Sequence, residues 1–390
     1  MGADKPPLGV GMVGYAFMGR VHSQAWRSVS AFFDLPARPV MAAVCGRSAE
    51  GTAAAAEQMG WAAAETDWRK LIARDDVQLV DICTPGDSHA EIAIAALEAG
   101  KHVLCEKPLA NTVAEAEAMA QAARAAARRG VYAMVAFNYR RVPAVAQAAR
   151  WVAEGRLGQI RHVRAQYLQD WIVDPEFPLV WRLQKELAGS GALGDIGAHI
   201  IDTAQFITGQ RLTQVSGLTE TFITQRPLAE ASAGLSAEGG GSEGARMGRV
   251  DVDDAALFIG RLSGGAVASF EATRFATGRK NALRIEVNGS AASLAFDFEA
   301  MNELWFHDHA LPAEEAGFRR VLVTEAGHPY AGAWWPPGHG LGYEHTFTHE
   351  VKDFVEAIAS GIAPTPSFDD GLNVQRVLAA VERSAADQSR

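Results

Sequence analysis

The sequence predicts an α/β protein with two domains, the first built on a doubly wound parallel sheet and the second an α+β domain with a mainly antiparallel sheet. At 390 residues the chain exceeds the size at which a single core keeps growing. Short apolar segments alternate with helical patterns in the first third of the chain, which is typical of βα units. β-rich segments dominate after about residue 160. We therefore expect residues 1–140 to form the first domain and residues 141–390 the second.

Composition and charge describe an ordinary globular protein. Hydrophobic residues make up 48% of the chain, and 46 acidic against 36 basic side chains give a net charge of −10. A surface that binds nucleic-acid phosphates needs clustered Lys and Arg, so we expect no nucleic-acid partner. No apolar run is long enough to span a bilayer, and residues 1–8 lack the pattern of a signal peptide or twin-arginine leader, so we expect no membrane partner.

The three cysteines, Cys45, Cys83 and Cys105, each lie near the end of an apolar run and show no C-x-x-C spacing. This pattern predicts buried thiols in a reducing compartment rather than disulfides or zinc ligands. We therefore expect a cytoplasmic protein.

The first strand leads into a glycine turn and then a helix. Residues 8–14 are apolar, and a helical pattern runs through Trp26. A dinucleotide-binding Rossmann turn needs Gly14 for the tight turn, a small residue at Ala16 so that the backbone can approach a pyrophosphate, and Gly19 for packing of helix on strand. Ala16 departs from the usual G-x-G-x-x-G pattern. Glycine turns also occur without ligands, but the position in the first βα unit favours a dinucleotide site.

The second strand, residues 39–45, ends in Gly46-Arg47-Ser48. An NAD site usually has a carboxylate here for the ribose 2′-hydroxyl, whereas an arginine can accommodate the 2′-phosphate of NADP. No carboxylate lies between residues 40 and 49. Because Arg47 could bind that phosphate or stack on the adenine of either cofactor, the sequence leaves NAD and NADP open.

The third strand, residues 79–83, ends in Thr84-Pro85-Gly86-Asp87-Ser88-His89. Asp87 or Ser88 can cap a helix over residues 89–99, and Gly100 can terminate it. This explanation needs no ligand.

The next strand, residues 103–105, stops at Glu106-Lys107-Pro108. Pro108 favours extended geometry at Lys107, so the lysine is held at a strand end, where ligands bind in open parallel sheets. The alternative is a surface turn with a solvated Glu-Lys pair. A helix and a strand within residues 113–137 complete the first domain.

The second domain is expected to contain an antiparallel sheet with one or two helices against it. Ser263-Gly264-Gly265 and Asn288-Gly289 are hairpin signals. Residues 229–248 are rich in glycine and predict a mobile insertion. Amphipathic helices over residues 344–361 and 368–386 are expected to close this domain. The expected strands are 160–169, 212–224, 254–262, 265–274, 282–288 and 291–297.

A glycine-rich segment contains an acid and a histidine four residues apart. The helical pattern over residues 196–206 predicts that Asp195 and His199 share one helix face. A carboxylate one turn away can orient an imidazole and make it a general base. The alternative is that Asp195 caps the helix and His199 packs in the core. Glycines at 191, 194 and 197 argue against it, because they imply something large against the backbone.

Three other histidine groupings carry weaker predictions. His345 and His349 are four apart, but no H-E-x-x-H is present, so we expect no metal. Residues 307–309, His-Asp-His, predict a polar turn. The aromatic segment of residues 334–340 could bind a sugar ring or form a rigid lid.

Four motifs together resemble those of one enzyme family in their order and spacing. They are the glycine turn, Cys83-Thr84-Pro85 with His89, Glu106-Lys107-Pro108, and Gly194-Asp195-Ile196-Gly197-Ala198-His199. The chain is identified on these motifs as similar to the glucose-fructose oxidoreductase and inositol dehydrogenase (Gfo/Idh/MocA) family. Within it, residues 169–175, 181–182 and 335–339 look most like levoglucosan dehydrogenases and related sugar or inositol dehydrogenases.

The resemblance implies a Rossmann domain, an open-faced sheet whose face is the surface of a homo-oligomer (dimer or tetramer), a cis Lys107–Pro108 bond, and no metal. It also implies hydride transfer from a carbinol C–H to the nicotinamide of NAD, with NADP not excluded, and with Lys107, Asp195 and His199 around the reacting hydroxyl. The residues implied to line the dinucleotide are Gly14, Ala16, Phe17, Met18, Arg47, Thr84, His89, Glu106 and Lys107. Lys107, Asp195 and His199 would then contact the substrate, and we also expect substrate contacts from Tyr139, Asp170, Arg182, Trp335 and His339.

We therefore expect an NAD(P)-dependent dehydrogenase that oxidises a secondary hydroxyl of a cyclic polyol or sugar, such as a levoglucosan-like anhydrosugar or inositol, to the ketone. Either His199, oriented by Asp195, or Lys107 could be the base. Two other functions stay open: an NAD-retaining glycoside hydrolase and a non-catalytic NAD(P)-binding regulator. A regulator has no need of proton-transfer groups, so the three residues argue against it.

Overall fold

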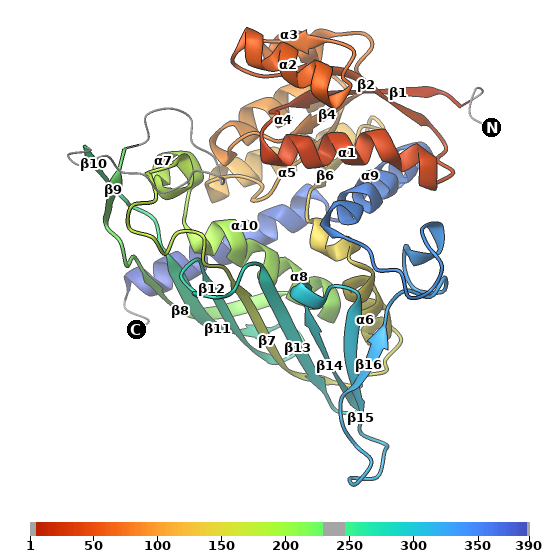
Figure 1. Cartoon of the computed structure of the whole chain (residues 1–390), viewed down its shortest axis with the longest axis vertical. Coiled ribbons are helices and arrows are strands. Elements are labelled where there is room, and N and C mark those ends of the chain that lie inside the picture. The colour runs from red at the N-terminus through yellow and green to blue at the C-terminus, as the bar shows by residue number, and fades with distance from the viewer. Residues whose placement is uncertain (1–4, 229–245, 388–390) are drawn as a thin grey trace. The chain divides into compact units, whose positions relative to one another are not determined.

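The computed structural model describes residues 5–228 and 246–387 (Figure 1), which form two compact units. The first unit contains the chain up to Asn138 together with Tyr343–Gln375, and the second contains Tyr139–Gly342 and the chain from Arg376. None of the described helices is long and apolar enough to cross a membrane. The chain thus leaves the first unit after Asn138 and returns to it for Tyr343–Gln375.

The first unit is organised around a sheet of six strands. They are β1 (Pro7–Val13), β2 (Arg38–Cys45), β3 (Ala64–Glu65), β4 (Leu79–Ile82), β5 (His102–Cys105) and β6 (Ala133–Val135). All neighbours are parallel, and the order β3-β2-β1-β4-β5-β6 reverses direction between β1 and β4. The doubly wound sheet is confirmed. Ligands of such sheets bind beyond the carboxyl ends of the strands at this switch point.

Short sequence signals set the ends of the helices in this unit. The helices are α1 (Phe17–Phe32), α2 (Ala49–Met59), α3 (Trp68–Ala73), α4 (His89–Glu98), α5 (Val113–Ala127) and α9 (Tyr343–Ser360). Thr112 and Glu115 form a capping box at the start of α5. Gly100, at φ 78°, follows the end of α4 as expected. The expected side-chain cap at Ser88 is wrong, because its hydroxyl donates to the Pro85 carbonyl instead.

Helix α9 packs in the first unit, although the sequence suggested that it closes the second domain. Its Phe347, Val351 and Phe354 are buried in the same apolar cluster as Trp26 of α1 and Met12 of β1. An amphipathic pattern predicts a helix with an apolar face, but it does not specify which surface that face covers.

The second unit contains a sheet of eight strands. They are β7 (Ile160–Leu168), β8 (Leu212–Glu220), β11 (Ala255–Leu262), β12 (Val267–Thr273), β13 (Ala282–Gly289), β14 (Ala292–Asp297), β15 (Glu303–Asp308) and β16 (Arg319–Leu322). Their order is β16-β15-β14-β13-β7-β12-β11-β8, and of these neighbouring pairs β7–β12 is parallel and the others are antiparallel. The mainly antiparallel sheet is confirmed. Two of its strands were not expected, and the turn expected at His307 and Asp308 is the end of β15.

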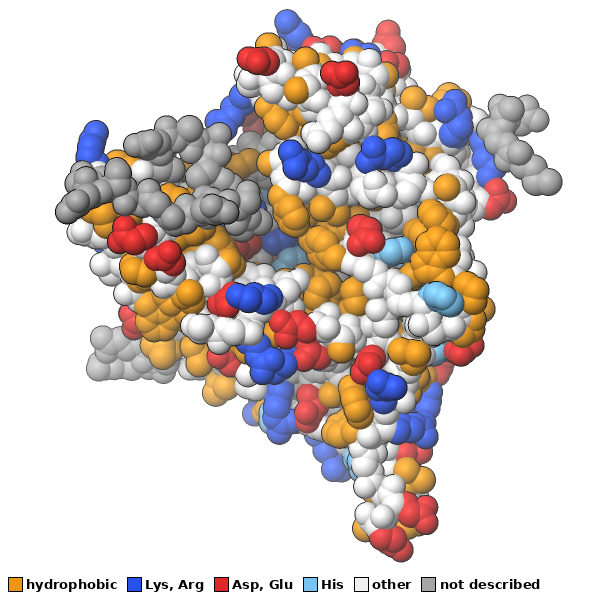
Figure 2. Space-filling view, viewed as in Figure 1, with side chains coloured by type: hydrophobic (Ala, Val, Ile, Leu, Met, Phe, Trp, Pro, Cys, Tyr) orange, Lys and Arg blue, Asp and Glu red, His pale blue; other side chains and the backbone are white. Residues whose placement is uncertain are grey.

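Helices α6 (Pro143–Ala153) and α8 (Ala198–Thr208) pack against one face of this sheet. Helix α10 (Phe368–Ala386) begins in the first unit and ends in the second. The short strands β9 (Gln225–Pro227) and β10 (Met247–Arg249) pair with each other on either side of the expected insertion, of which residues 229–245 lie outside the described part of the chain. On the face seen in Figure 2, positive and negative side chains are interspersed.

The packing of α9 generates a stability prediction. Phe354 is fully buried, whereas Ile362, just beyond the same helix, is 67% exposed. Phe354→Ala should destabilise the protein by about 3 kcal/mol, since it leaves a cavity, and Ile362→Ala should change stability by less than about 0.5 kcal/mol. Denaturant unfolding of both variants measures this. Equal stabilities would contradict the packing of α9 in the core.

Candidate active site

The β1–α1 turn is shaped by two close backbone approaches. Gly14 has φ 98°, and a Cβ there would lie 2.8 Å from the Cys83 carbonyl oxygen. A Cβ at Gly19 would lie 2.3 Å from the Gly14 carbonyl oxygen. Helix α1 begins after Ala16 without a side-chain cap and without an acidic residue in its first turn. The turn therefore has the geometry of an anion-binding helix N-terminus.

The remaining expected cofactor residues in this turn and after β2 are accessible. Phe17 is exposed, and its ring stacks on Tyr343 with a centroid separation of 6.4 Å. Met18 is partly buried, and Arg47 is exposed directly beyond the carboxyl end of β2. These side chains are therefore open to a ligand along the strand ends.

His89 joins the loops that follow β4 and β5. Its ring is buried, with Nε2 2.9 Å from the Thr84 carbonyl oxygen and Nδ1 3.1 Å from that of Pro108. The Lys107–Pro108 peptide is cis, as expected. Both ring nitrogens therefore contact carbonyl groups of the protein. His89 connects the loop after β4 to the loop after β5.

The Glu106 carboxylate is also committed to contacts within the chain. Its Oε1 lies 3.0 Å from His22 Nε2, and its Oε2 accepts a hydrogen bond of 3.1 Å from the backbone N–H of Lys107. The Lys107 side chain is partly exposed. Sequence reasoning missed His22, because a single histidine within a helical pattern carries no signal of its own.

The three cysteines are buried and free, as expected. Burial raises the pKa of the Cys45 thiol to about 11. Burial also raises the pKa of Cys83 and of Cys105, with further increases from nearby carboxylates. All three therefore stay protonated at neutral pH, unlike reactive or metal-binding thiolates.

In the second unit, Asp195 and His199 lie on a continuous helical segment. Asp195 belongs to a single π-helical turn, η4 (Leu193–Gly197), and His199 to the start of α8. Asp195 is not the cap of α8, whose N-cap is Gly197. Residues 196–206 are helical as expected, but the helical segment begins earlier, because the π-helical turn precedes α8. π-Turns of this kind are frequent at functional sites.

Gly191, four residues before Asp195, is needed for packing against the backbone of the protein itself. A Cβ at Gly191 would lie 1.7 Å from the Asp253 carbonyl oxygen. The Asp253 carboxylate accepts hydrogen bonds of 2.7 Å from the N–H groups of Gly191 and Leu193. Burial raises the pKa of Asp253, although Arg274 and these two N–H groups oppose the increase.

Arg274 is a fully buried cation beside Asp195. Its Nη1 lies 3.7 Å from Asp195 Oδ2, and its Nη2 donates to the Asp253 carbonyl oxygen at 3.1 Å. The guanidinium also lies 5.4 Å from the ring of Trp171. A buried positive charge favours the ionised form of a neighbouring carboxylate, so Arg274 supports an Asp195 carboxylate that can orient a base. Nothing in the sequence distinguished Arg274 from other strand-end arginines.

His199 is buried among aromatic side chains. Its ring lies 4.6 Å from that of Tyr139 and 5.8 Å from that of Tyr167. The two tyrosine hydroxyls are 2.6 Å apart, and that of Tyr167 donates to Asn281 Oδ1 at 2.7 Å. The structure therefore brings Tyr139 and His199 together as expected, and it adds Tyr167 and Asn281, which had no sequence signal.

Two other expected substrate residues, Asp170 and Arg182, also lie in the second unit, after β7 and in a short 3-10 helix respectively. Asp170 accepts hydrogen bonds from Lys280 Nζ at 2.8 Å and from the N–H of Gly278 at 3.0 Å. Burial tends to raise the pKa of Asp170, but these two donors hold it below its usual value. Arg182 lies over the ring of Trp181. Asp170 is thus ordered by its own loop contacts.

The aromatic segment of residues 334–340 forms a separate loop. Trp335 is exposed, and His339 Nδ1 lies 2.9 Å from the Pro336 carbonyl oxygen. Gly338 N–H donates to Thr324 Oγ1 at 3.0 Å, which fastens the loop to the chain after β16.

The close approach at Gly191 generates a prediction. Gly191→Ala should destabilise the protein by roughly 1–3 kcal/mol, since the new methyl would collide with backbone. Gly197→Ala is the matched control, because its Cβ would lie 3.5 Å from the nearest atom. It should be neutral or stabilising by about 0.5 kcal/mol. Thermal unfolding compares the two, and a well-tolerated Gly191→Ala would disprove the close approach.

Known proteins are similar to this chain over much of its length. The chain is 44% identical over 384 residues to levoglucosan dehydrogenase of Pseudarthrobacter phenanthrenivorans, covering 98% of this chain and 97% of that one. A 1,5-anhydro-D-fructose reductase of Ensifer adhaerens is 33% identical and covers 63% of this chain and 65% of its own.

Solved structures share the fold over nearly the whole chain. An oxidoreductase domain protein from Kribbella flavida is 65% identical with a TM-score of 0.94, covering 98% of both chains. A levoglucosan dehydrogenase in complex with NADH and levoglucosan is 43% identical with a TM-score of 0.90, covering 98% of both chains.

Two family descriptions match the two parts of the chain. Residues 8–137 match the oxidoreductase family with an NAD-binding Rossmann fold, and residues 145–295 match the GFO/IDH/MocA C-terminal domain. With the β1–α1 turn and the motifs described above, these matches show that the chain belongs to the GFO/IDH/MocA family of NAD-binding oxidoreductases.

Proposed function

We propose that this enzyme is an NAD-dependent dehydrogenase that oxidises a secondary hydroxyl of a cyclic polyol or sugar to the ketone, with a levoglucosan-like anhydrosugar as the first candidate and inositol as the second. The observation that carries the proposal is the set of Lys107, Asp195 and His199 in a chain that is 44% identical to a levoglucosan dehydrogenase over almost its full length. Relatives named for anhydro-sugar substrates also support this substrate class.

The β1–α1 turn fits the pyrophosphate of NAD. A Cβ at Gly14 or Gly19 would collide with backbone atoms, so the turn depends on glycine at both positions. The N-terminus of α1 has no side-chain cap and offers its N–H groups to a diphosphate. Gly14, Ala16, Phe17 and Met18 would hold this part of the cofactor, Arg47 the adenosine ribose, and Thr84 with Glu106 and Lys107 the nicotinamide end. Bound NAD would supply the hydride acceptor.

The residues of the chain would handle the proton and the charge on oxygen. His199 takes the proton of the substrate hydroxyl, and Asp195, which lies beside Arg274, orients the imidazole. The Lys107 ammonium hydrogen-bonds the same oxygen and stabilises its developing negative charge. Lys107 is the alternative base. Tyr139, Asp170, Arg182, Trp335 and His339 are proposed to bind the other ring hydroxyls.

One assay series tests this assignment. Absorbance of the reduced nicotinamide, followed with NAD and NADP against levoglucosan, inositols and pyranoses, should show turnover with NAD and a levoglucosan-like substrate. His199→Ala and Lys107→Ala should each lower kcat about a hundredfold or more. The matched exposed controls, His309→Ala and Lys70→Ala, should leave kcat unchanged.

Three outcomes would contradict the proposal in different ways. Near-normal turnover of both active-site variants would refute the residue assignment. Hydrolysis of a glycoside with NAD that purifies with the protein, and without net reduction, would indicate a glycoside hydrolase. Binding of NADH without turnover of any substrate would indicate a regulator.

We also propose that the enzyme is a cytoplasmic homo-oligomer. Three buried, unpaired thiols fit a reducing compartment. On the face of the second-unit sheet, Leu218, Leu257, Ile259 and Trp305 are exposed and line one hollow. Leu218 and Leu257 are paired in register on β8 and β11. Exposed apolar side chains gathered in this way support burial against a second copy of the sheet.

Light scattering on a sizing column tests the oligomer proposal. The unmodified protein should elute as a dimer or tetramer, and Ile259→Glu, at a 63% exposed position, should shift it toward monomer without a loss of helical content. Thr213→Glu, exposed on β8, is the control. A monomeric unmodified protein would contradict this surface assignment.

A further inference from the structure

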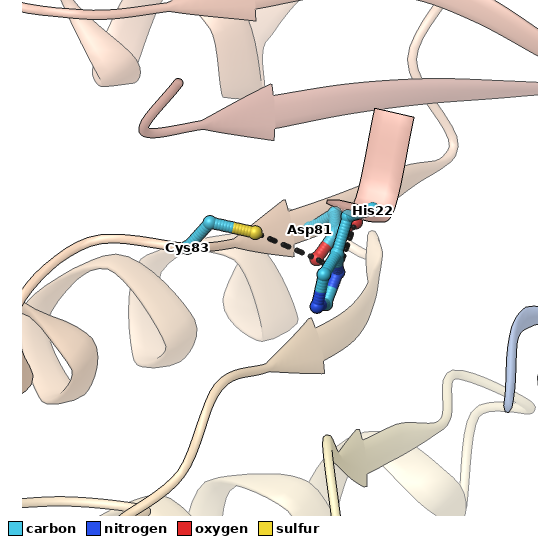
Figure 3. A group of neighbouring side chains, drawn as sticks. All are labelled: His22, Asp81 and Cys83. Atoms are coloured by element: carbon cyan, nitrogen blue, oxygen red, sulfur yellow. Dashed lines mark hydrogen bonds and ion pairs between the residues drawn. The ribbon is translucent and has the colours of Figure 1, made fainter. Parts of the chain in front are cut away.

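Three buried side chains connect the centre of the parallel sheet to the turn around Lys107, residues 106–108, which we call the Lys107 corner. His22 of α1, Asp81 of β4 and Glu106 after β5 are 1%, 0% and 4% exposed. His22 Nδ1 lies 3.0 and 2.9 Å from the two Asp81 carboxylate oxygens, and His22 Nε2 lies 3.0 Å from Glu106 Oε1. Figure 3 shows the histidine ring directed at the Asp81 carboxylate, with Cys83 on the other side of that carboxylate.

Carboxylates face both ring nitrogens of His22, and this arrangement favours a doubly protonated ring. Ionised carboxylates only accept hydrogen bonds, so each ring nitrogen that faces one must carry hydrogen. Burial by itself lowers the pKa of His22, but the charge and hydrogen bond of Asp81 raise it well above its usual value. Phe347 of α9, which covers the ring at 5.3 Å, carries no charge. His22 is therefore an imidazolium between two carboxylates.

A metal ion fits this cluster less well than a proton network. The side-chain atoms of His22, Asp81 and Cys83 lie within 4.8 Å of one another. Burial raises the pKa of the Cys83 thiol far above its usual range, so it keeps its proton and instead donates to Asp81 Oδ1. Trp26 Nε1 donates to Asp81 Oδ2 at 2.7 Å. Both carboxylate oxygens of Asp81 are thus already occupied by donors.

The network ends at the backbone of the proposed catalytic lysine. Glu106 Oε2 accepts the N–H of Lys107 at 3.1 Å, while Oε1 faces His22. Asp81 lies on β4, and Glu106 follows its paired neighbour β5, with the Glu106 N–H donating to the Ile82 carbonyl oxygen at 2.9 Å. The Glu106 carboxylate is thus held at both of its oxygens, and it gives the Lys107 N–H a partner in a fixed position.

We propose that His22 is a positioning residue: by bridging Asp81 and Glu106 it fixes the Glu106 carboxylate on the Lys107 backbone and so sets the place from which the Lys107 ammonium acts. The catalytic part of this proposal rests on the role proposed above for Lys107. The structural part concerns the charge of His22 and the order of residues 103–109, and it is independent of any substrate.

The charge of His22 is tested in the unmodified protein by ¹⁵N NMR of its ring, assigned by its absence in His22→Phe. Both nitrogens should carry hydrogen at pH 7. Because the folded pKa is raised, His22 stabilises the protein fully below its unfolded pKa of about 6.5, and this contribution is lost as pH rises through the folded pKa. The difference in Tm between the unmodified protein and His22→Phe should therefore be largest at low pH. A neutral ring at pH 7, or stoichiometric zinc in the purified protein, would overturn the proposal.

The positioning role is tested by hydrogen exchange and by kinetics. His22→Phe should speed amide exchange across residues 103–109 about tenfold or more, and it should lower kcat about tenfold while the Kd for NADH stays within about twofold. Glu106→Gln, which preserves the shape of the side chain, should also speed amide exchange and lower kcat. The double variant should lower kcat by less than the product of the two single effects.

The control is His102→Phe, at the opposite end of β5, where the ring accepts the Tyr132 N–H at 3.0 Å. It should lose stability without changing exchange at residues 106–108 or kcat. Unchanged exchange in both His22→Phe and Glu106→Gln would overturn the positioning role. Absence of dehydrogenase activity in the unmodified protein would contradict the proposed function alone, since ring charge and exchange are measured without turnover.

Discussion

The ion pairing of His22 with Asp81 and Glu106 is the interaction on which the order of the Lys107 corner depends. A buried charge is costly unless it is paired, and removing one partner of a buried pair typically costs about 3–5 kcal/mol. Here one histidine ring lies between two carboxylates, that of Asp81 on β4 and that of Glu106 directly after the neighbouring strand β5. The network therefore links α1, β4 and the end of β5, and through the Glu106 carboxylate it holds the backbone N–H of Lys107.

The second unit solves a similar problem with a different cation. Arg274 is fully buried, contacts Asp195 and the Asp253 backbone, and lies over Trp171. The Asp253 carboxylate in turn holds the N–H groups at the start of the π-helical segment. In both units a buried cation contacts a carboxylate of the proposed site: Glu106, which precedes Lys107, in the first unit, and Asp195 itself in the second. Fixed charges of this kind need no reorganisation when charge develops on a substrate oxygen.

The sequence predicted features that depend on local pattern and missed those that depend on long-range packing. Alternating apolar segments predicted the parallel sheet, and Gly14 and Gly19 marked a turn that no Cβ could occupy. The pattern of α9 predicted a helix but not its partner surface, because an apolar face does not name what covers it. Arg274 and Asp253 were missed for the same reason, because their contacts depend on long-range packing. The close approach of the Asp253 backbone explains why residue 191 is a glycine. His22 was missed because its partners lie 59 and 84 residues away.

The most direct measurement of the central claim follows a deuterium atom. The enzyme is incubated with NAD and with levoglucosan that carries deuterium on its carbinol carbons. The mass of the NADH formed is then measured by mass spectrometry. A dehydrogenase that moves hydride from a carbinol carbon, with proton transfer at His199 or Lys107, must yield nicotinamide that carries one deuterium. Reduced nicotinamide without deuterium, or a ring-opened sugar without reduced nicotinamide, would contradict the account.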